Sequence, residues 1–441
     1  MGRDIGRAME IEEGKGSAAN GQHIVAGGSP LNSESSKARS GESEKEWLRE
    51  MDCPPTRREA LPTPKQKDDN SSIWSIMWSI LKESLGKDLT HITLPFFFNE
   101  PLSVLQKTME DLEYADLLNK AATKPPQSIE RMLYVAAFAV SSYSGTNNRY
   151  LKPFNPLLGE TFEFEYPEQN WRGLAEKVVH HPTVIAMHGE GESWSFEADA
   201  DVRAKFWGRS VELIPVGLIR LKFDDGDEYN WAKVTSSLHI MGKPHIEHSG
   251  VMQISNLQSS LLAKIKFEAS SRLSWAESHQ VSGEFLRDKE KLLCTLTGTW
   301  DKELSITMPN GAKRKIWQTY PMPKAESRYN MTKFAIYLNE VTPGLKGKLA
   351  PTDSRLRPDQ HALEEGVYDQ ANAEKKRLEV KQRAVRKAAE QNKDPLEPCW
   401  FEQIPKGVAG ETAMYKYKGG YWEARKCGNW KKCRDIFGQA S

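Results

Sequence analysis

The sequence predicts an α+β protein dominated by a large antiparallel sheet or barrel, with helical segments before and after it in the chain. Three observations support this fold class. Short alternating runs of apolar and polar residues, separated by turn residues, recur over residues 152–320. Apolar residues at helical spacing precede this region, and a basic helical stretch, AEKKRLEVKQRAVRKAAEQNK, follows it at Ala373–Lys393.

Composition excludes several classes of protein. The 441 residues include 61 Lys and Arg against 60 Asp and Glu, so the overall charge gives no support for nucleic-acid binding. The five cysteines show neither CxxC pairs nor zinc-ligand spacing, which is typical of a reducing compartment. The N-terminus lacks a signal peptide, and the longest apolar run, Met132–Val140, is too short to span a bilayer. We therefore expect a cytoplasmic protein that touches membranes only peripherally.

The segment before the sheet divides into three parts. Residues 1–70 are rich in Gly, Ser, Glu, Lys and Pro, and we expect them to be disordered because they bury too little apolar surface. Ile73–Leu85 has a wide apolar face with two tryptophans, which fits either a helix packed on the core or a mobile, membrane-touching flap. Residues 101–145 then predict two helices, the second over Ile129–Ser141.

Four local patterns are candidates for chemistry, and each has a simpler structural interpretation. KPFNPLLGE, Lys152–Glu160, is a proline-rich loop that carries one lysine and one asparagine. EKVVHHPT places His180 and His181 together where Pro182 is expected to end a strand, although such pairs often combine one core and one surface histidine. Lys375, Glu379 and Arg383 have i, i+4, i+8 spacing, which also suits an ordinary solvated helix face. The fourth pattern is the stiff apolar stretch LPFFFNEP.

Taken together, these patterns resemble the oxysterol-binding-protein-related proteins. LPFFFNEPLSVLQ resembles a motif near that family's lid, KPFNPLLGE matches a family loop, and EKVVHHPT resembles the signature usually written EQVSHHPP. PTDSRLRPDQHALEEG and the EKKRLEVKQR helix match the family's C-terminal segment. Lys177, Val179 and Thr183 depart from the signature but spare both histidines, and the stretch Ser237–Gly250 is about two residues shorter than usual.

The resemblance implies a near-closed antiparallel β-barrel around an apolar tunnel, in the family's short type without a pleckstrin-homology domain. It assigns 71–441 to the lipid-binding domain, with a lid region at 71–100, a helical pair at 101–145, the barrel at 152–320, C-terminal helices at 354–395 and a surface-wrapping tail at 396–441. It implies transfer of one lipid at a time, with a sterol exchanged for phosphatidylinositol 4-phosphate. The phosphoinositide headgroup would be held by Lys152, Asn155, His180, His181, Lys375, Glu379 and Arg383, and the tunnel or lid would include Leu94, Phe96, Tyr143 and Phe154.

The chemistry of these residue types agrees with a headgroup site. Lysine and arginine donate charge-assisted hydrogen bonds to phosphate, and a nearby phosphate favours protonated imidazole. Glu379 is expected to orient its basic neighbours or to accept hydrogen bonds from inositol hydroxyls. A sterol has one hydroxyl and binds mainly through apolar burial, so it should not need this site. The sequence thus predicts a carrier that uses no catalytic residue, cofactor or metal.

Three alternatives stay open. The tunnel could carry phosphatidylserine or another phospholipid instead of a sterol. A metal-dependent hydrolase could use the histidine pair with His188 and Glu190, although no helix aligns these residues. The basic helix could bind a nucleic acid or a protein partner, although no known motif supports this. We expect anionic membranes as partners, and the sequence shows no motif that identifies a receptor at the endoplasmic reticulum.

Overall fold

A computed structural model describes residues 47–48, 51, 57–65, 98–241, 244–269, 279–325, 328–393, 395–404 and 414–438. The chain divides into two units, Met1–Glu46 and Trp47–Ser441, and every described element belongs to the second. The helix predicted over Ile73–Leu85 lies outside the described residues, as do Leu94 and Phe96. Residues 57–65 fall in the segment predicted to be disordered, yet they have defined contacts: Arg58 Nη2 donates to Glu364 at 2.6 Å.

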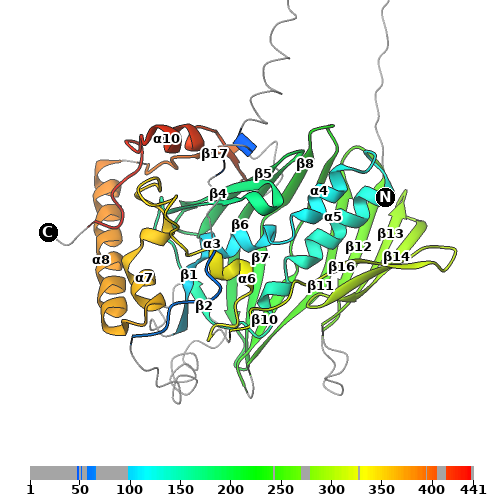
Figure 1. Ribbon diagram of the computed structural model, residues 1–441, viewed down its shortest axis with the longest axis horizontal. Helices are drawn as coiled ribbons and strands as arrows, with labels where there is room; N and C mark the ends of the chain where they lie inside the picture. The colour runs from blue at the N-terminus through cyan, green and yellow to red at the C-terminus, as the bar shows by residue number, and fades with distance from the viewer. Residues whose placement is uncertain are drawn as a thin grey trace, which may run out of the picture. The chain divides into compact units, whose positions relative to one another are not determined.

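A single antiparallel sheet of 14 strands forms most of the described structure (Figure 1). Its main order is β16-β15-β14-β13-β12-β11-β10-β7-β6-β5-β4-β3, and the β8–β9 hairpin joins β6 to β11 beside β7 and β10. The edge strands β3 and β16 do not pair with each other in the described part of the chain. The strands are β3 (Thr161–Tyr166), β4 (Trp171–Val179), β5 (Val184–Gly191), β6 (Trp194–Phe206), β7 (Ser210–Val216), β8 (Ile219–Phe223), β9 (Glu228–Trp231), β10 (Thr235–His239), β11 (His245–Asn256), β12 (Leu261–Phe267), β13 (Gln280–Arg287), β14 (Lys291–Thr299), β15 (Glu303–Thr307) and β16 (Lys313–Gln318).

The acidic cluster at Asp224–Glu228 connects β8 to β9, as expected for a hairpin turn rather than a calcium loop. Buried Arg131 neutralises it: Nη2 donates to Asp225 at 2.6 Å and Nη1 donates to Asp227 at 3.2 Å. Arg131 lies on α5, so this ion pair also fixes the helix against the turn.

The helices before the sheet are short and buried. They are α3 (Val104–Met109), α4 (Asp116–Ala122) and α5 (Ile129–Ser141), and the last has the range that its apolar run predicted. Ser103 and Gln106 form a reciprocal capping box at the start of α3, and the Ser128 hydroxyl caps α5. α5 contacts β12 and β16. Helical side chains such as Phe138 and Val140 therefore share one core with the sheet.

Buried arginine–carboxylate bonds hold β1 (Asn99–Ser103) in place next to α3. Arg149 donates to both Glu100 oxygens, at 2.8 and 3.0 Å, and to both Glu110 oxygens at 2.8 Å. All three side chains are buried, so each charge depends on its partners in this network for compensation. β1 pairs in parallel with β2 (Lys152–Phe154), so this network positions the strand that begins the KPFNPLLGE loop.

The C-terminal region consists of helices α7 (Pro358–Glu364), α8 (Tyr368–Asn392) and α10 (Tyr421–Cys427), and the β17–β18 hairpin (Phe401–Ile404 and Met414–Tyr417). α8, the long orange helix of Figure 1, packs on α7. Trp400, Phe401 and Tyr421 pack against Leu174 and Val178 of β4. The tail thus has regular elements that its irregular sequence did not indicate.

Candidate functional site

The KPFNPLLGE loop is held rigidly by hydrogen bonds from buried groups. The Glu160 carboxylate accepts from the Leu157 backbone N–H at 2.8 Å, and Arg357 Nη1 donates both to Glu160 at 3.0 Å and to the Asn155 carbonyl at 2.9 Å. Gly159 has φ +80°, a left-handed conformation that favours glycine, and its N–H donates to the carbonyl of Lys177. The loop therefore presents the exposed Lys152 and Asn155 side chains from a fixed backbone.

Lys152 and Lys375 lie close together although they are far apart in the sequence. The Asn99 side chain links them, because its Nδ2 donates to the Lys152 carbonyl at 3.0 Å while its Oδ1 accepts from Lys375 Nζ at 3.5 Å. Desolvation by the surrounding protein lowers the pKa of both lysines, and the Glu379 carboxylate opposes the shift in each case. Two partly desolvated ammonium groups that share one carboxylate would gain strongly from an added anion.

His180 and His181 lie side by side in the turn between β4 and β5. β4 ends at Val179 and β5 begins at Val184, so the expected end of the strand before Pro182 is confirmed. The ring centroids are 4.2 Å apart at an angle of 56°. His180 is half-buried and His181 is exposed. Because the strand alternation stops here, both imidazoles can face one ligand.

A cleft of about 610 Å³ opens beside the histidine pair. One wall comes from Val178, Val179 and both histidines, and the other comes from the end of α8 and the segment 395–398 with Tyr415. Basic side chains on this second wall are Arg386 and Lys393. Glu176 fixes the wall to β4, because its carboxylate accepts the backbone N–H groups of Cys399 and Trp400 at 2.7 and 2.9 Å.

Arg386 is a candidate site residue that the sequence reasoning missed. It lines the cleft, whereas Arg383 is exposed, is not among the described residues of the lining, and donates from Nε to the carbonyl of Glu379 at 3.2 Å. Arg386 follows Lys375 by 11 residues, about three helical turns, which returns it to nearly the same face of α8. The next member of the i, i+4, i+8 series is Lys387, so that spacing passes over Arg386, which the i, i+11 spacing finds.

Buried Lys177 connects the lysine pair to the cleft. Its Nζ donates to Asn155 Oδ1 at 3.0 Å and to the Pro156 carbonyl at 2.7 Å, which turns the Asn155 amide NH₂ away from it. Burial lowers the pKa of Lys177 to about 7, the Glu160 carboxylate opposes this shift, and the charges of Arg357, Lys152 and Arg386 add to it. Lys177 therefore orients Asn155, one of the predicted headgroup-binding residues, by holding its side-chain oxygen. Lysine at this position is a departure from the family signature.

Lys177 predicts a measurable pH dependence of stability. Between pH 7 and the usual lysine pKa, the unfolded chain holds a proton that the folded chain has lost, so stability rises with pH over this window. Relative to Lys177→Met, the free energy of unfolding of the wild type should increase by about 2 kcal/mol between pH 6 and pH 9. Urea unfolding of both proteins at each pH measures the difference. A difference that stays constant or falls would contradict the buried, deprotonating lysine.

An apolar row crosses β6, β7, β10 and β11. Phe206, Val211, Leu238 and Ile246 are directly paired neighbours across these strands, so they share one face of the sheet. His248, two residues after Ile246, contacts Tyr143 and Trp300, which places this face toward the core. Every side chain of β7 and β10 is partly accessible, so this part of the sheet is not packed solid.

Two of the four predicted tunnel or lid residues are described. Phe154 is buried against Ala362 and Leu363, with the Arg357 guanidinium 5.2 Å from its ring centroid. Tyr143 is buried in the main core, and its hydroxyl accepts a hydrogen bond from the Val234 N–H at 2.8 Å. Neither contact tests a role in the tunnel, which stays a prediction for both.

Comparison with known proteins establishes the family. Residues 76–426 match the family model described as oxysterol-binding protein. The chain belongs to the oxysterol-binding protein family. Oxysterol-binding protein-related protein 2B of Arabidopsis thaliana is 47% identical over 393 residues, which cover 87% of this chain and 54% of that protein. Oxysterol-binding protein homolog 1 of Saccharomyces cerevisiae is 39% identical over 394 residues, covering 82% of this chain and 33% of the relative. The chain spans about half the length of several relatives that it matches.

Solved structures confirm the fold that the sequence predicted for an oxysterol-binding-protein relative. The Osh1 ORD domain in complex with cholesterol has a TM-score of 0.81 and 36% identity, and covers 90% of this chain and 100% of the domain. The Osh3 ORD of Saccharomyces cerevisiae in complex with PI(4)P has a TM-score of 0.75 and 33% identity, covering 86% and 99%. Oxysterol-binding-protein-related proteins bind and transfer lipids and are not enzymes. No helix in the described ranges is long and apolar enough to cross a membrane.

Proposed function

We propose that this chain binds one lipid at a time and transfers it between membranes, exchanging a sterol for phosphatidylinositol 4-phosphate. The observation that carries the proposal is the cleft that His180, His181 and Arg386 line together. Lys152 and Lys375 are not among the described residues of this lining. They form a separate basic pair, and the charges of both Lys152 and Arg386 act on buried Lys177, which binds Asn155. Such a cluster of basic and imidazole side chains suits an anionic headgroup.

These residues would contribute to headgroup binding in different ways. Lys152, Lys375 and Arg386 supply charge, and the oriented Asn155 amide and the two imidazoles donate hydrogen bonds. Glu379 would orient both lysines, since its charge acts on each of them. Arg383 stays a proposed contributor from the rim of the site.

The exchange partner would use the apolar row instead of the basic cleft. A sterol offers one hydroxyl and a rigid apolar body, so burial of its surface supplies nearly all of its binding free energy. The two solved relatives bear out each class of ligand in their own case, one with cholesterol and one with PI(4)P. The acyl chains of a bound phosphoinositide would cover the same apolar row, so the two lipids would bind in alternation, and this competition would couple the transfer of one to that of the other.

The test is extraction by the full chain from vesicles that contain a fluorescent sterol, phosphatidylinositol 4-phosphate or both. We expect each lipid to be extracted alone, at no more than about one per chain, and each to displace the other. Extraction of neither lipid, or simultaneous binding of both, would refute the proposal. If phosphatidylserine displaces the phosphoinositide and the sterol does not, the second lipid is a phospholipid.

Two neighbouring arginines on α8 give a matched comparison. Arg386→Ala should weaken phosphoinositide extraction by roughly tenfold or more, the value of one charge-assisted hydrogen bond, because Arg386 lines the cleft. Arg383→Ala removes the same charge from an exposed position and should weaken extraction by less than about threefold. Extraction from vesicles measures both effects. If the two substitutions weaken extraction equally, Arg386 is not a headgroup-binding residue.

We also infer that the protein acts peripherally at anionic membrane surfaces. α8 exposes Lys376, Arg383 and Lys387 in addition to the residues that face the cleft. Each basic residue near an anionic surface contributes about 1 kcal/mol, and salt screens this attraction. Binding to vesicles with phosphatidylserine should exceed binding to neutral vesicles and should decline with added salt, whereas binding that ignores both variables would contradict the inference.

A further inference from the structure

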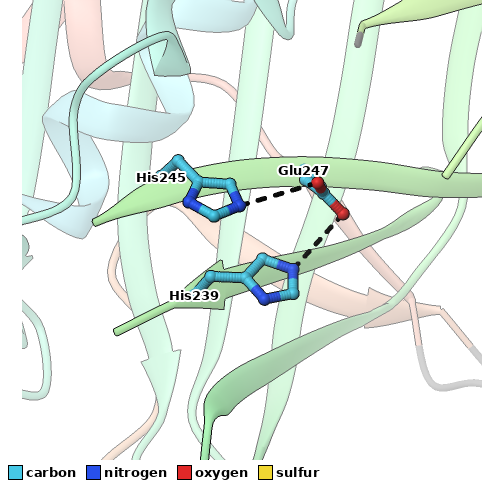
Figure 2. A group of neighbouring side chains, drawn as sticks. All are labelled: His239, His245 and Glu247. Carbon is cyan, nitrogen blue, oxygen red and sulfur yellow. Dashed lines mark ion pairs between the residues drawn. The ribbon is translucent and has the colours of Figure 1, made fainter. Parts of the chain in front are cut away.

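Three polar side chains gather on the β10–β11 hairpin, on the face of the sheet opposite the apolar row. His239 of β10 lies directly opposite His245 of β11, and Glu247 follows His245 by two residues on the same face of the strand. Figure 2 shows both imidazoles directed toward the Glu247 carboxylate, one from each strand. Ile246 and His248 occupy the opposite face, toward the core, so the cluster lies behind the apolar row.

The distances within the cluster match those between metal ligands as well as those of the ion pairs that protonated imidazoles would form with Glu247. His239 Nε2 lies 3.3 Å from Glu247 Oε2, and His245 Nε2 lies 3.6 Å from Glu247 Oε1. In a tetrahedral zinc site with metal–ligand distances of about 2.0–2.2 Å, neighbouring ligand atoms are separated by about 3.3–3.6 Å. One ligand atom from each of the three residues lies within 4.8 Å of the others. A small rotation of the stacked rings, whose centroids are 4.6 Å apart, would close the third edge.

The environment is also that of a ligand site. His239 Nε2 is buried and has no hydrogen-bond partner among the described residues, although it points at a carboxylate. A neutral imidazole in this position has a lone pair to donate, which a metal ion would use. The three side chains keep 33, 30 and 18% of their surface exposed, so an ion could reach them from solvent.

We propose that His239, His245 and Glu247 form a binding site for a divalent transition-metal ion of the zinc class. Two imidazoles and one carboxylate favour Zn²⁺ and similar ions over Ca²⁺ and Mg²⁺, which prefer oxygen ligands alone. Three protein ligands leave a fourth position for water. The bound ion would bridge β10 and β11 next to the turn of the hairpin and hold the two strands in register.

The site is independent of the proposed lipid exchange. Its residues lie on the polar face of the sheet with Glu212 and Ser237, which pair with each other across β7 and β10. Among the described residues, His180 and His181 belong to no comparable group of ligands. The metal would therefore stabilise the hairpin without occupying the cleft.

The experiment is titration of Zn²⁺ alone into the metal-free full chain, followed by calorimetry and by competition with a chromophoric chelator. We expect His239→Ala and Glu247→Gln each to raise the dissociation constant of one bound Zn²⁺ ion by more than roughly tenfold. His361→Ala removes an exposed imidazole that also pairs with a glutamate, Glu365, and should leave that dissociation constant unchanged. Co²⁺ in place of Zn²⁺ should give tetrahedral absorption bands in the wild type that both site variants lose.

Comparing variants separates this site from any binding by cysteines, which all the proteins retain. Glu247→Gln keeps the size and hydrogen-bonding capacity of the side chain, so it controls for loss of folding in His239→Ala. The same Zn²⁺ stoichiometry and affinity in wild type and both site variants would overturn the proposal, as would a wild type that binds no Zn²⁺.

Discussion

Replacing His180 and His181 together with alanine is expected to reduce phosphoinositide extraction by roughly 100-fold or more and to leave sterol uptake within about twofold. Each imidazole that donates to an anionic phosphate contributes about 1.5–3 kcal/mol, so the loss of both donors removes at least about 3 kcal/mol. A sterol would bind to the apolar row and not to these donors. Substitution of the two histidines should therefore affect phosphoinositide extraction and leave sterol uptake nearly unchanged.

The measurement is extraction of each lipid from separate vesicle populations by wild type and variant. His361→Ala serves as a control, because it removes an exposed histidine from α7, which the cleft lining does not include. A parallel loss of sterol uptake and phosphoinositide extraction would show a folding defect, or that both lipids depend on the histidine pair. Unchanged phosphoinositide extraction would show that the histidine pair does not hold the headgroup.

Arg149→Met is expected to lower the free energy of unfolding by about 3–5 kcal/mol. The substitution leaves Glu100 and Glu110 buried without their cation, and breaking a buried ion pair from one side is costly because the remaining charges stay desolvated. Burial and the charge of Glu110 already raise the pKa of neighbouring Glu113 to about 8, so this region has little capacity for further negative charge.

The matched control is Arg314→Met, which breaks an exposed ion pair with Glu130 and should cost less than about 1 kcal/mol. Urea unfolding followed by tryptophan fluorescence measures both variants. Because Glu100 adjoins Asn99, the Arg149 substitution should also loosen the link between Lys152 and Lys375. Equal stability losses in the two variants would show that the buried network contributes no more to the free energy of unfolding than an exposed ion pair does.

The sheet was predictable from local pattern because alternation records which face of a strand is buried. β12 alternates strictly, as the buried Leu261, Ala263 and Ile265 show. The same rule gives less information for β7, because every one of its side chains is partly accessible and neither face stands out as buried. The tail was obscure for another reason: its elements are short and depend on Trp400 and Tyr421 packing against a distant strand.

The candidate site was only partly accessible to sequence reasoning. The histidine pair and the lysine loop were noticed as residue types, but their roles came from the resemblance to the family. Arg386 was missed because a helix face is read correctly only when its whole length is considered. The hairpin cluster was missed because His239, His245 and Glu247 become neighbours through strand pairing, and spacing along the chain does not reveal cross-strand register.

The fixing of residues 395–398 and Tyr415 over the end of β4 has a consequence for biosynthesis. The ribosome produces the histidine turn long before it produces this opposite wall. If the cleft holds the headgroup as proposed, a nascent chain has only one of its two walls and would not retain a phosphoinositide while it is still being translated. Lipid loading would then be confined to the finished polypeptide, and a stalled or truncated product would not withdraw lipid from the surface on which it was made.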